Sequence, residues 1–211
     1  MSDARLREQI VSCGKSLFER GLSFGSAGNL SVKLDDGWLM TPTNVSLGRL
    51  DPARLARLDK KGRPIAGDAP TKEAALHIAM YEARKSCAAI VHLHATHSVA
   101  VSCLADIDPD DVLPPITAYF VMRVGKLKLL PYFPPGDPAL ASAIGAVAAK
   151  HSAVLLANHG PVVAGTSLEA AMNAAEELEE TAKLYLLLHS RPTRFLTPEQ
   201  VQALALKYPI P

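Results

Sequence analysis

Three of the seven histidines in this 211-residue chain lie in one short stretch, VHLHATH at residues 91–97. If the stretch is a β-strand, His92 and His94 project from one face and Leu93 from the other. Two imidazoles one strand step apart can bind one divalent cation, which then needs a further ligand from another segment. His159 is the best candidate, because the Gly-Pro after it favours a turn that could aim its side chain from a strand end. Scattered histidines at a strand edge are the alternative interpretation.

Glu73 could add a carboxylate to such a site. It follows the turn-like segment GDAPTK and falls in the first turn of a helix expected to begin at Thr71. A helix N-terminus favours an anion and leaves backbone N–H groups free. A plain capping residue is the alternative interpretation of a carboxylate in this position.

Two loops are rich in hydrogen-bond donors. GSAGN at residues 25–29 has the glycines and small polar side chains of an anion-binding loop, although it lacks the lysine of a P-loop. TPTN at residues 41–44 supplies further hydroxyls. Together with the histidines, these loops are the parts of a metal site beside a phosphate site.

The composition limits the classes of protein that fit. A hydrophobic fraction of 48%, a charged fraction of 20% and a net charge of +1 are typical of a globular protein and give no reason to expect nucleic acid or a membrane as partner. No apolar run approaches the roughly 20 residues of a membrane span, and MSDARLREQI does not resemble a signal peptide. Three cysteines without a CxxC pair predict reduced thiols in a cytoplasmic protein.

Helices and strands alternate along the chain. Hydrophobic spacing predicts helices at 4–20, from 71, at 98–104, at 137–151 and at 167–189. GSAGNLSVKL, at 25–34, leads into an expected strand, and further strands are expected at 38–43 and 88–95. Residues 153–165 are expected to form two short strands joined through Asn-His-Gly-Pro, and the stretch 116–133 is predicted to be extended. With no linker or repeat, this pattern indicates one domain of the α/β or α+β class, with helices covering a sheet.

Taken in order, GSAGNLS, TPT, GDAPTKEAALH, VHLH and LLANHGPVV resemble the class II aldolase/adducin family over roughly residues 5–195. The resemblance implies a single domain over residues 1–211, of the α/β class: a three-layer α/β/α sandwich with a mostly antiparallel central sheet. The segments TKE, VMRVG, LLPYF, PGD, EELEETAKL and RPTRFLT are most similar to the branch that decarboxylates 3-oxo-tetronate 4-phosphates.

The resemblance also implies the parts of the site. It implies one zinc or other divalent ion held by His92, His94 and His159, with Glu73 as fourth ligand or acid/base group. Tyr119 would lie near the substrate as a second catalytic group, and packing in the sheet is its alternative role. The implied phosphate-binding residues are Ser26, Asn29, Thr43, Asn44, Thr71 and Lys72. Asn44 stands where the family often has glycine, and Thr71-Lys72 replaces the paired serines of the aldolases.

The implied reaction is that of a carbon–carbon lyase. It is the decarboxylation of a 3-oxo-tetronate 4-phosphate to dihydroxyacetone phosphate and CO2, through a metal-stabilised enediolate. A sugar-phosphate aldolase of the fuculose or ribulose phosphate type, or an epimerase of the same family, is the alternative. An adducin-like module without metal and a metal-dependent hydrolase are the remaining hypotheses. Family members form cyclic tetramers with shared active sites, so a homotetramer is expected, with Tyr208 as a residue that could reach a neighbour.

Overall fold

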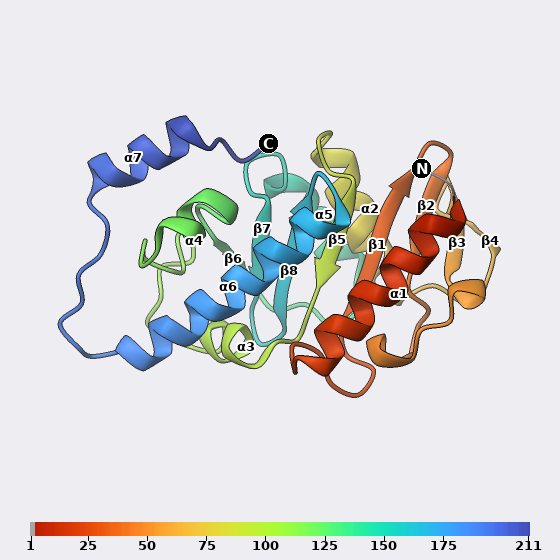
Figure 1. Ribbon diagram of the computed structural model, residues 1–211, viewed down its shortest axis with the longest axis horizontal. Helices are drawn as coiled ribbons and strands as arrows, with labels where there is room; N and C mark the ends of the chain where they lie inside the picture. The colour runs from red at the N-terminus through yellow and green to blue at the C-terminus, as the bar shows by residue number, and fades with distance from the viewer. Residues whose placement is uncertain (1–2) are drawn as a thin grey trace.

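A computed structural model describes residues 3–211 (Figure 1). Its centre is a sheet formed by β1 (Asn29–Leu34), β2 (Gly37–Met40), β3 (Ala56–Asp59), β4 (Pro64–Ala66), β5 (Ala89–His92), β6 (Lys128–Leu130), β7 (Ala153–Leu156) and β8 (Gly160–Gly165). The strand order is β4-β3-β2-β1-β5-β8-β7-β6. Neighbouring strands are antiparallel except β6 and β7, which run parallel, so the sheet is mixed but mostly antiparallel as expected.

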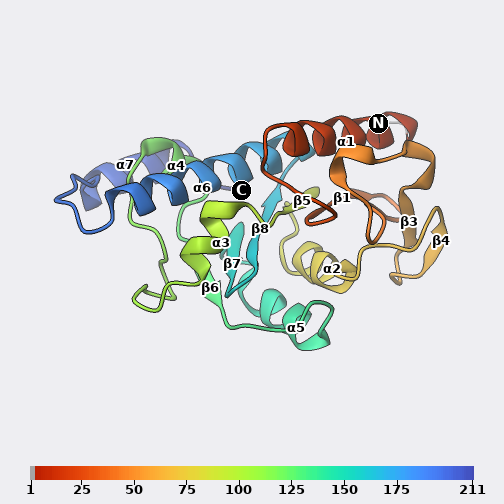
Figure 2. The ribbon, with the colours of Figure 1, turned by 90° about the horizontal axis from the view of Figure 1, so that it is seen from below.

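Helices cover both faces of this sheet. They are α1 (Asp3–Glu19), α2 (Ala74–Ala83), α3 (Thr96–Ser102), α4 (Ala118–Arg123), α5 (Pro138–Val147), α6 (Leu168–Leu188) and α7 (Pro198–Lys207), with short 3-10 helices at Leu47–Arg49 and Pro52–Arg54. Figure 2 shows α1 and α6 along one face and α2 and α5 along the other. The predicted three-layer sandwich is confirmed. None of the described helices is long and apolar enough to cross a membrane.

The two faces of the sheet bury separate apolar cores, and alternation along each strand decides which side chain enters which core. In β5, Ala89 and Val91 pack in the core under α1 and α6, whereas Ile90 packs in the core under α2 and α5. By the same alternation His92, at the end of β5, faces the α2 side, where it is fully buried. The strand therefore delivers an imidazole into the layer that contains the start of α2.

The prediction that the stretch 116–133 is extended is wrong over Ala118–Arg123, which form α4. Thr117 begins the helix by accepting a hydrogen bond from the Phe120 N–H. Phe120 and Val121 are then buried, with α4 packing on α6 and α7. The β-propensity of YFV is outweighed by the cap and by this tertiary burial.

Helix α2 begins at Ala74 rather than at Thr71, with Glu73 as its N-cap residue. Residues 70–71 stay extended because Pro70 pairs with Pro42 in an isolated bridge and the Thr71 N–H donates to the Thr41 carbonyl. Helix α7 is not among the predicted elements. Its capping box, in which Thr197 and Gln200 bond reciprocally, is the sequence signal that could have identified it.

The buried carboxylate of Glu179, on α6, holds the start of α3. It accepts hydrogen bonds from the backbone N–H and Nδ1 of His97, and from the backbone N–H and hydroxyl of Ser98. Burial raises the pKa of this carboxyl, but the hydrogen bonds from Ser98 and His97 lower the pKa by more than burial raises it. The pKa of Glu179 is therefore below its ordinary value. His97 and Ser98 therefore have a structural role, and α3 is tied to α6.

We expect Glu179→Gln to destabilise the fold by about 1–3 kcal/mol, because an amide nitrogen replaces one acceptor and leaves buried donors unpaired. A depressed pKa stabilises the folded state above the unfolded pKa, and this contribution is lost as the pH falls through the folded value. The difference between wild type and variant in urea unfolding should therefore narrow below about pH 4. Glu180→Gln, at an exposed neighbour that pairs with Lys183, is the matched control. Equal losses of stability in the two variants would contradict the role of Glu179 in holding the start of α3.

Candidate metal centre and anion pocket

Three imidazoles and one carboxylate converge at the edge of the sheet where β5 and β7 end. His94 Nε2 lies 3.2 Å from His92 Nε2 and 3.1 Å from His159 Nε2. Glu73 Oε2 lies 3.2 Å from His92 Nε2, and Glu73 Oε1 lies 3.4 Å from His159 Nε2. One potential ligand atom from each of the four residues lies within 4.8 Å of the others. The structure thus brings together the four residues expected to bind metal.

The ring nitrogens are prepared to act as ligands. His92 Nδ1 donates to the Pro161 carbonyl at 2.8 Å, which leaves its Nε2 lone pair toward the cluster. Burial and the neighbouring histidines lower the pKa of His94 to about 4. Burial and the charge of His92 lower the pKa of His159 to about 4 as well. Both rings are therefore neutral at pH 7, and each can offer a lone pair.

Glu73 is ionised in this environment. Burial raises its pKa, but His92 and the amide of Asn29 lower it by more, so the pKa is far below its ordinary value. The reciprocal attraction raises the pKa of His92 against the opposing effect of burial. The Glu73 side chain makes no capping hydrogen bond with α2. The capping interpretation of this carboxylate is therefore not supported.

Tight backbone approaches bring the ligands together. His94 lies beyond the end of β5, so the strand alone does not align it with His92. The turn between β7 and β8 reaches it because residue 160 is glycine: a Cβ there would stand 2.2 Å from the Leu93 carbonyl oxygen. Asn158 adopts a positive φ of 55° in this turn, a conformation that asparagine tolerates. The Asn-His-Gly-Pro segment therefore places His159 against His94.

The cluster fits a divalent cation. Zinc–nitrogen bonds of about 2.0–2.1 Å imply tetrahedral ligand atoms roughly 3.3–3.4 Å apart. The contacts of 3.1–3.4 Å between the ligand atoms are close to this value. Glu73 Oε1 is fully buried and has no hydrogen-bond partner within residues 3–211. A cation would satisfy this oxygen and would bind beside ring nitrogens that lie 3.1–3.2 Å apart.

A small pocket of about 120 Å³ opens beside the cluster. Its wall includes all the predicted phosphate-binding residues, Ser26, Asn29, Thr43, Asn44, Thr71 and Lys72, as well as Glu73, His94 and His159. The two loops that carry most of them are joined by backbone hydrogen bonds, from Thr43 N–H to the Ala69 carbonyl and from Thr71 N–H to the Thr41 carbonyl. The structure therefore places the residues predicted to bind phosphate around one pocket, directly beside the histidine and glutamate cluster.

Gly28 shapes the same wall. Its φ is +82°, and a Cβ at this position would stand 3.0 Å from the His92 carbonyl oxygen, so there is little room for any other residue. Asn44 also adopts a positive φ, of 58°. The predicted loop residues thus depend on backbone conformations that few side chains tolerate.

Sequence reasoning missed the residues of an adjoining open groove. Phe24, Tyr132, Pro135 and Asn158 line it, together with the cluster residues His94 and His159. Phe24 and Tyr132 are 57% and 59% exposed. Their signal in the sequence was weak, because single aromatic residues in loops are as often part of the core.

Tyr119 does not join the cluster in its own chain. It lies on α4, is 57% exposed, and its ring packs under the guanidinium of Arg123. Tyr208, after α7, is 40% exposed. Neither residue lines the pocket beside the cluster.

The comparisons with known proteins agree with this geometry. Residues 8–186 match the family model of the class II aldolase and adducin N-terminal domain. The chain belongs to the class II aldolase/adducin family.

Relatives in this family cover almost the whole chain. The 3-oxo-tetronate 4-phosphate decarboxylase of Haemophilus influenzae is 49% identical over 205 residues, 97% of this chain and 98% of that protein. L-Fuculose phosphate aldolase of Escherichia coli is 31% identical, over 99% of this chain and 96% of that protein. The crystal structure of YgbL from Klebsiella pneumoniae superposes with a TM-score of 0.94 at 48% identity, over 97% of this chain and 99% of that one.

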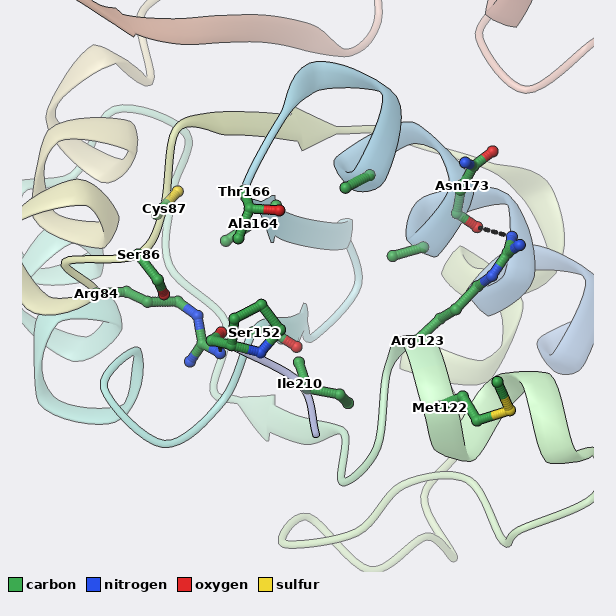
Figure 3. A pocket seen from close by; sticks show the side chains of 14 residues that line it. Arg84, Ser86, Cys87, Met122, Arg123, Ser152, Ala164, Thr166, Asn173 and Ile210 are labelled. Atoms are coloured by element: carbon green, nitrogen blue, oxygen red, sulfur yellow. Dashed lines mark hydrogen bonds between the residues drawn. The ribbon is translucent and has the colours of Figure 1, made fainter. Parts of the chain in front are cut away.

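This class II aldolase/adducin chain has another cavity, of about 260 Å³, at the opposite edge of its sheet (Figure 3). Arg84, at the end of α2, donates there to the carbonyl of Ala148 and to an oxygen of Pro211. Arg123 donates to the Asn173 carbonyl. Arg84 lies at the C-terminal end of α2 and Glu73 at its N-terminal end, and the helix between them is about 15 Å long. The cavity is therefore not part of the metal centre.

We expect His94→Ala and His159→Ala to weaken zinc binding by more than the roughly 10–100-fold that the loss of an outer-sphere partner costs, because each removes a direct ligand. Metal content after dialysis and isothermal titration with zinc measure this. His151→Ala, at a histidine outside the cluster that contacts the Lys126 carbonyl, is the control. Full zinc content in both cluster variants would exclude the proposed ligand set.

Proposed function

We propose that this protein is a decarboxylase of 3-oxo-tetronate 4-phosphates that forms dihydroxyacetone phosphate and CO2. The single observation that carries the proposal is the anion pocket lined by Thr43, Thr71 and Lys72, which shares a wall with the Glu73 and histidine cluster. The name and near-complete coverage of the 49% identical relative support the same substrate class.

The pocket residues bind and orient the substrate. Lys72 and the hydroxyls of Thr43 and Thr71 provide a cation and donors for the C4 phosphate. With the phosphate held there, the C2 and C3 oxygens are directed toward the cluster. Fixed orientation of this kind lowers the barrier without any new bond to the protein.

Loss of CO2 breaks the C1–C2 bond and leaves the electron pair in an enediolate over C2 and C3. A divalent ion, which we propose to be zinc, would be held by His92, His94, His159 and Glu73, and supplies Lewis-acid stabilisation of negative charge on oxygen when bound. Glu73, which is ionised in the resting site, would take up a proton from solvent at Oε1, the oxygen that has no hydrogen-bond partner among the described residues, and deliver it to C2. Protonation at C2 completes dihydroxyacetone phosphate.

A sugar-phosphate aldolase is the second candidate, because the 31% identical relative is an L-fuculose phosphate aldolase. Retro-aldol cleavage produces the same enediolate, so the same pocket and cluster serve either reaction. The two reactions differ in the group that leaves the carbon beside the ketone: CO2 in the decarboxylase and an aldehyde in the aldolase.

Product analysis tests the proposal. With zinc-loaded protein and a 3-oxo-tetronate 4-phosphate, we expect equal amounts of CO2 and dihydroxyacetone phosphate. The same acid without phosphate should lose about 100-fold in kcat/KM, because its orientation is lost. His94→Ala is the inactive control. Cleavage of fuculose phosphate to an aldehyde, with no release of CO2 from the acid, would establish the aldolase instead.

Glu73→Gln should lower kcat much more than it raises KM, because a proton acts only in the transition state. Zinc content must be measured in parallel, since a lost ligand would lower activity through the metal. An active Gln variant with full zinc would assign the proton to another group.

We also propose that the protein is a cytoplasmic homotetramer in which Tyr119 and Tyr208 of one subunit lie beside the cluster of a neighbouring subunit. Both are exposed and lie outside the pocket of their own chain, and Phe24 and Tyr132 leave an apolar rim beside the cluster. Exposed apolar patches of this kind favour association.

Light scattering should give a mass near four times 22.5 kDa. Tyr119→Phe should then lower kcat without changing the mass or the unfolding midpoint, because it removes only a hydroxyl. Tyr185→Phe, at a partly buried tyrosine on α6, is the control. A fully active monomer would contradict the shared site.

A further inference from the structure

A row of buried polar side chains leads from Glu73 into the interior between β1 and α2. Asn29 and Ser31 lie two residues apart on β1, and His77 and Tyr81 continue the i, i+4 row that begins with Glu73 at the N-cap of α2. A spacing of two on a strand and of four on a helix keeps each set on one face. All four side chains are buried: their exposed fractions are 6% for Asn29, 1% for Tyr81 and 0% for the other two.

The row is joined by an unbroken series of hydrogen bonds. Asn29 Nδ2 donates to Glu73 Oε2 at 2.8 Å, and Asn29 Oδ1 contacts His77 Nε2 at 2.5 Å. His77 Nδ1 contacts the Ser31 hydroxyl at 2.6 Å, and Ser31 Oγ contacts the Tyr81 hydroxyl at 2.8 Å. None of these side-chain atoms is among the unpaired buried polar atoms of residues 3–211.

Counting donors assigns a direction to every bond. An ionised Glu73 only accepts, so Asn29 must turn its NH2 group toward Glu73 and its oxygen toward His77. His77 must then carry a proton on Nε2. A fully buried imidazole is kept neutral by desolvation, so Nδ1 accepts and the Ser31 hydroxyl donates to it. Since Ser31 has one proton, its oxygen accepts from Tyr81.

We propose that Tyr81, Ser31 and His77 are positioning residues that fix the amide of Asn29 so that it holds Glu73 by one carboxylate oxygen only. Oε2 is bound by Asn29, and Oε1 stays without a hydrogen bond, 3.4 Å from His159 Nε2. The row thus occupies Oε2 with a hydrogen bond and leaves Oε1 free to bind a cation or a proton. The effect of this row on kcat rests on the proposed function, whereas its effects on the His77 tautomer and on zinc binding do not.

Packing alone does not account for the row. Apolar side chains of similar volume would fill the space between β1 and α2 without the cost of burying four polar groups. A buried network is favourable only when all its members are paired. If one member reverses its donor and acceptor, its neighbour must reverse as well or lose a hydrogen bond. Reversal of the His77 tautomer would turn the Asn29 oxygen toward the Glu73 carboxylate, which would repel it.

The tautomer of His77 is the most direct test. In protein labelled with ¹⁵N-histidine, we expect the NMR signals of His77 to report a proton on Nε2 and a bare Nδ1, with His77→Gln used for assignment. A proton on Nδ1, or a doubly protonated ring at pH 7, would overturn the proposal. This readout needs neither substrate nor metal, so it stands apart from the proposed reaction.

Two substitutions at His77 test the effect on Glu73. The amide of Gln can still donate to Asn29 Oδ1, whereas Leu of similar size cannot. We expect His77→Leu to weaken zinc binding by roughly 10–100-fold, as the loss of an outer-sphere partner does, and His77→Gln to recover most of it. Equal zinc affinities in two folded variants would contradict the proposal, and urea unfolding measures how much of either effect is stability.

Ser31→Ala removes the hydroxyl that sets the tautomer. We expect a lower zinc affinity and a lower kcat with KM little changed, together with a shift of the His77 signals away from the Nε2–H tautomer. Ser102→Ala is the matched control: that hydroxyl is also buried, but donates to the Val99 carbonyl outside the row. Unchanged His77 signals and zinc affinity in Ser31→Ala would show that the row does not act on Glu73.

Discussion

The buried carboxylate of Glu73 is the group on which the arrangement around it depends. An ionised carboxylate in the interior is costly unless charges and donors compensate for it. Here His92 lies 3.2 Å away and Asn29 donates to one oxygen, while the other oxygen is left without a hydrogen bond within residues 3–211. The start of β1, the end of β5 and the turn before β8 meet around this one side chain, and they contribute the compensating groups Asn29, His92 and His159 respectively.

Two buried glutamates in this protein differ in how the acceptor capacity of the carboxylate is used. Glu179 accepts four hydrogen bonds, all from His97 and Ser98, and so ties α3 to α6. Glu73 is equally buried but faces three imidazoles. A carboxylate whose acceptor capacity is filled stabilises the fold, whereas one with a free oxygen beside neutral ring nitrogens is suited to a cation or a proton. Sequence position alone did not separate them.

The two faces of the sheet divide these tasks. On the side of α1 and α6 the buried carboxylate is Glu179, which ties α3 to α6. The side that faces α2 contains Glu73, with His92, Asn29 and the polar row behind it. Alternation along β1 and β5 produces this division, since successive residues of a strand point to opposite layers.

The sequence alone determined the family, because the order and content of its motifs run over most of the chain. The resemblance then implied the layered α/β class and the four residues of the cluster, of which HxH, Glu73 and His-Gly-Pro were also candidates from their local sequence. Tertiary structure decided the rest. Residues 118–123 became a helix because Phe120 is buried against neighbouring helices, a contact that no local window contains. The meeting of His94 and His159 depends on the close approach of Gly160 to Leu93, and the row from Tyr81 to Glu73 depends on the packing of α2 on β1. These are long-range contacts, and residues far apart in a chain acquire a common environment only when the chain has folded.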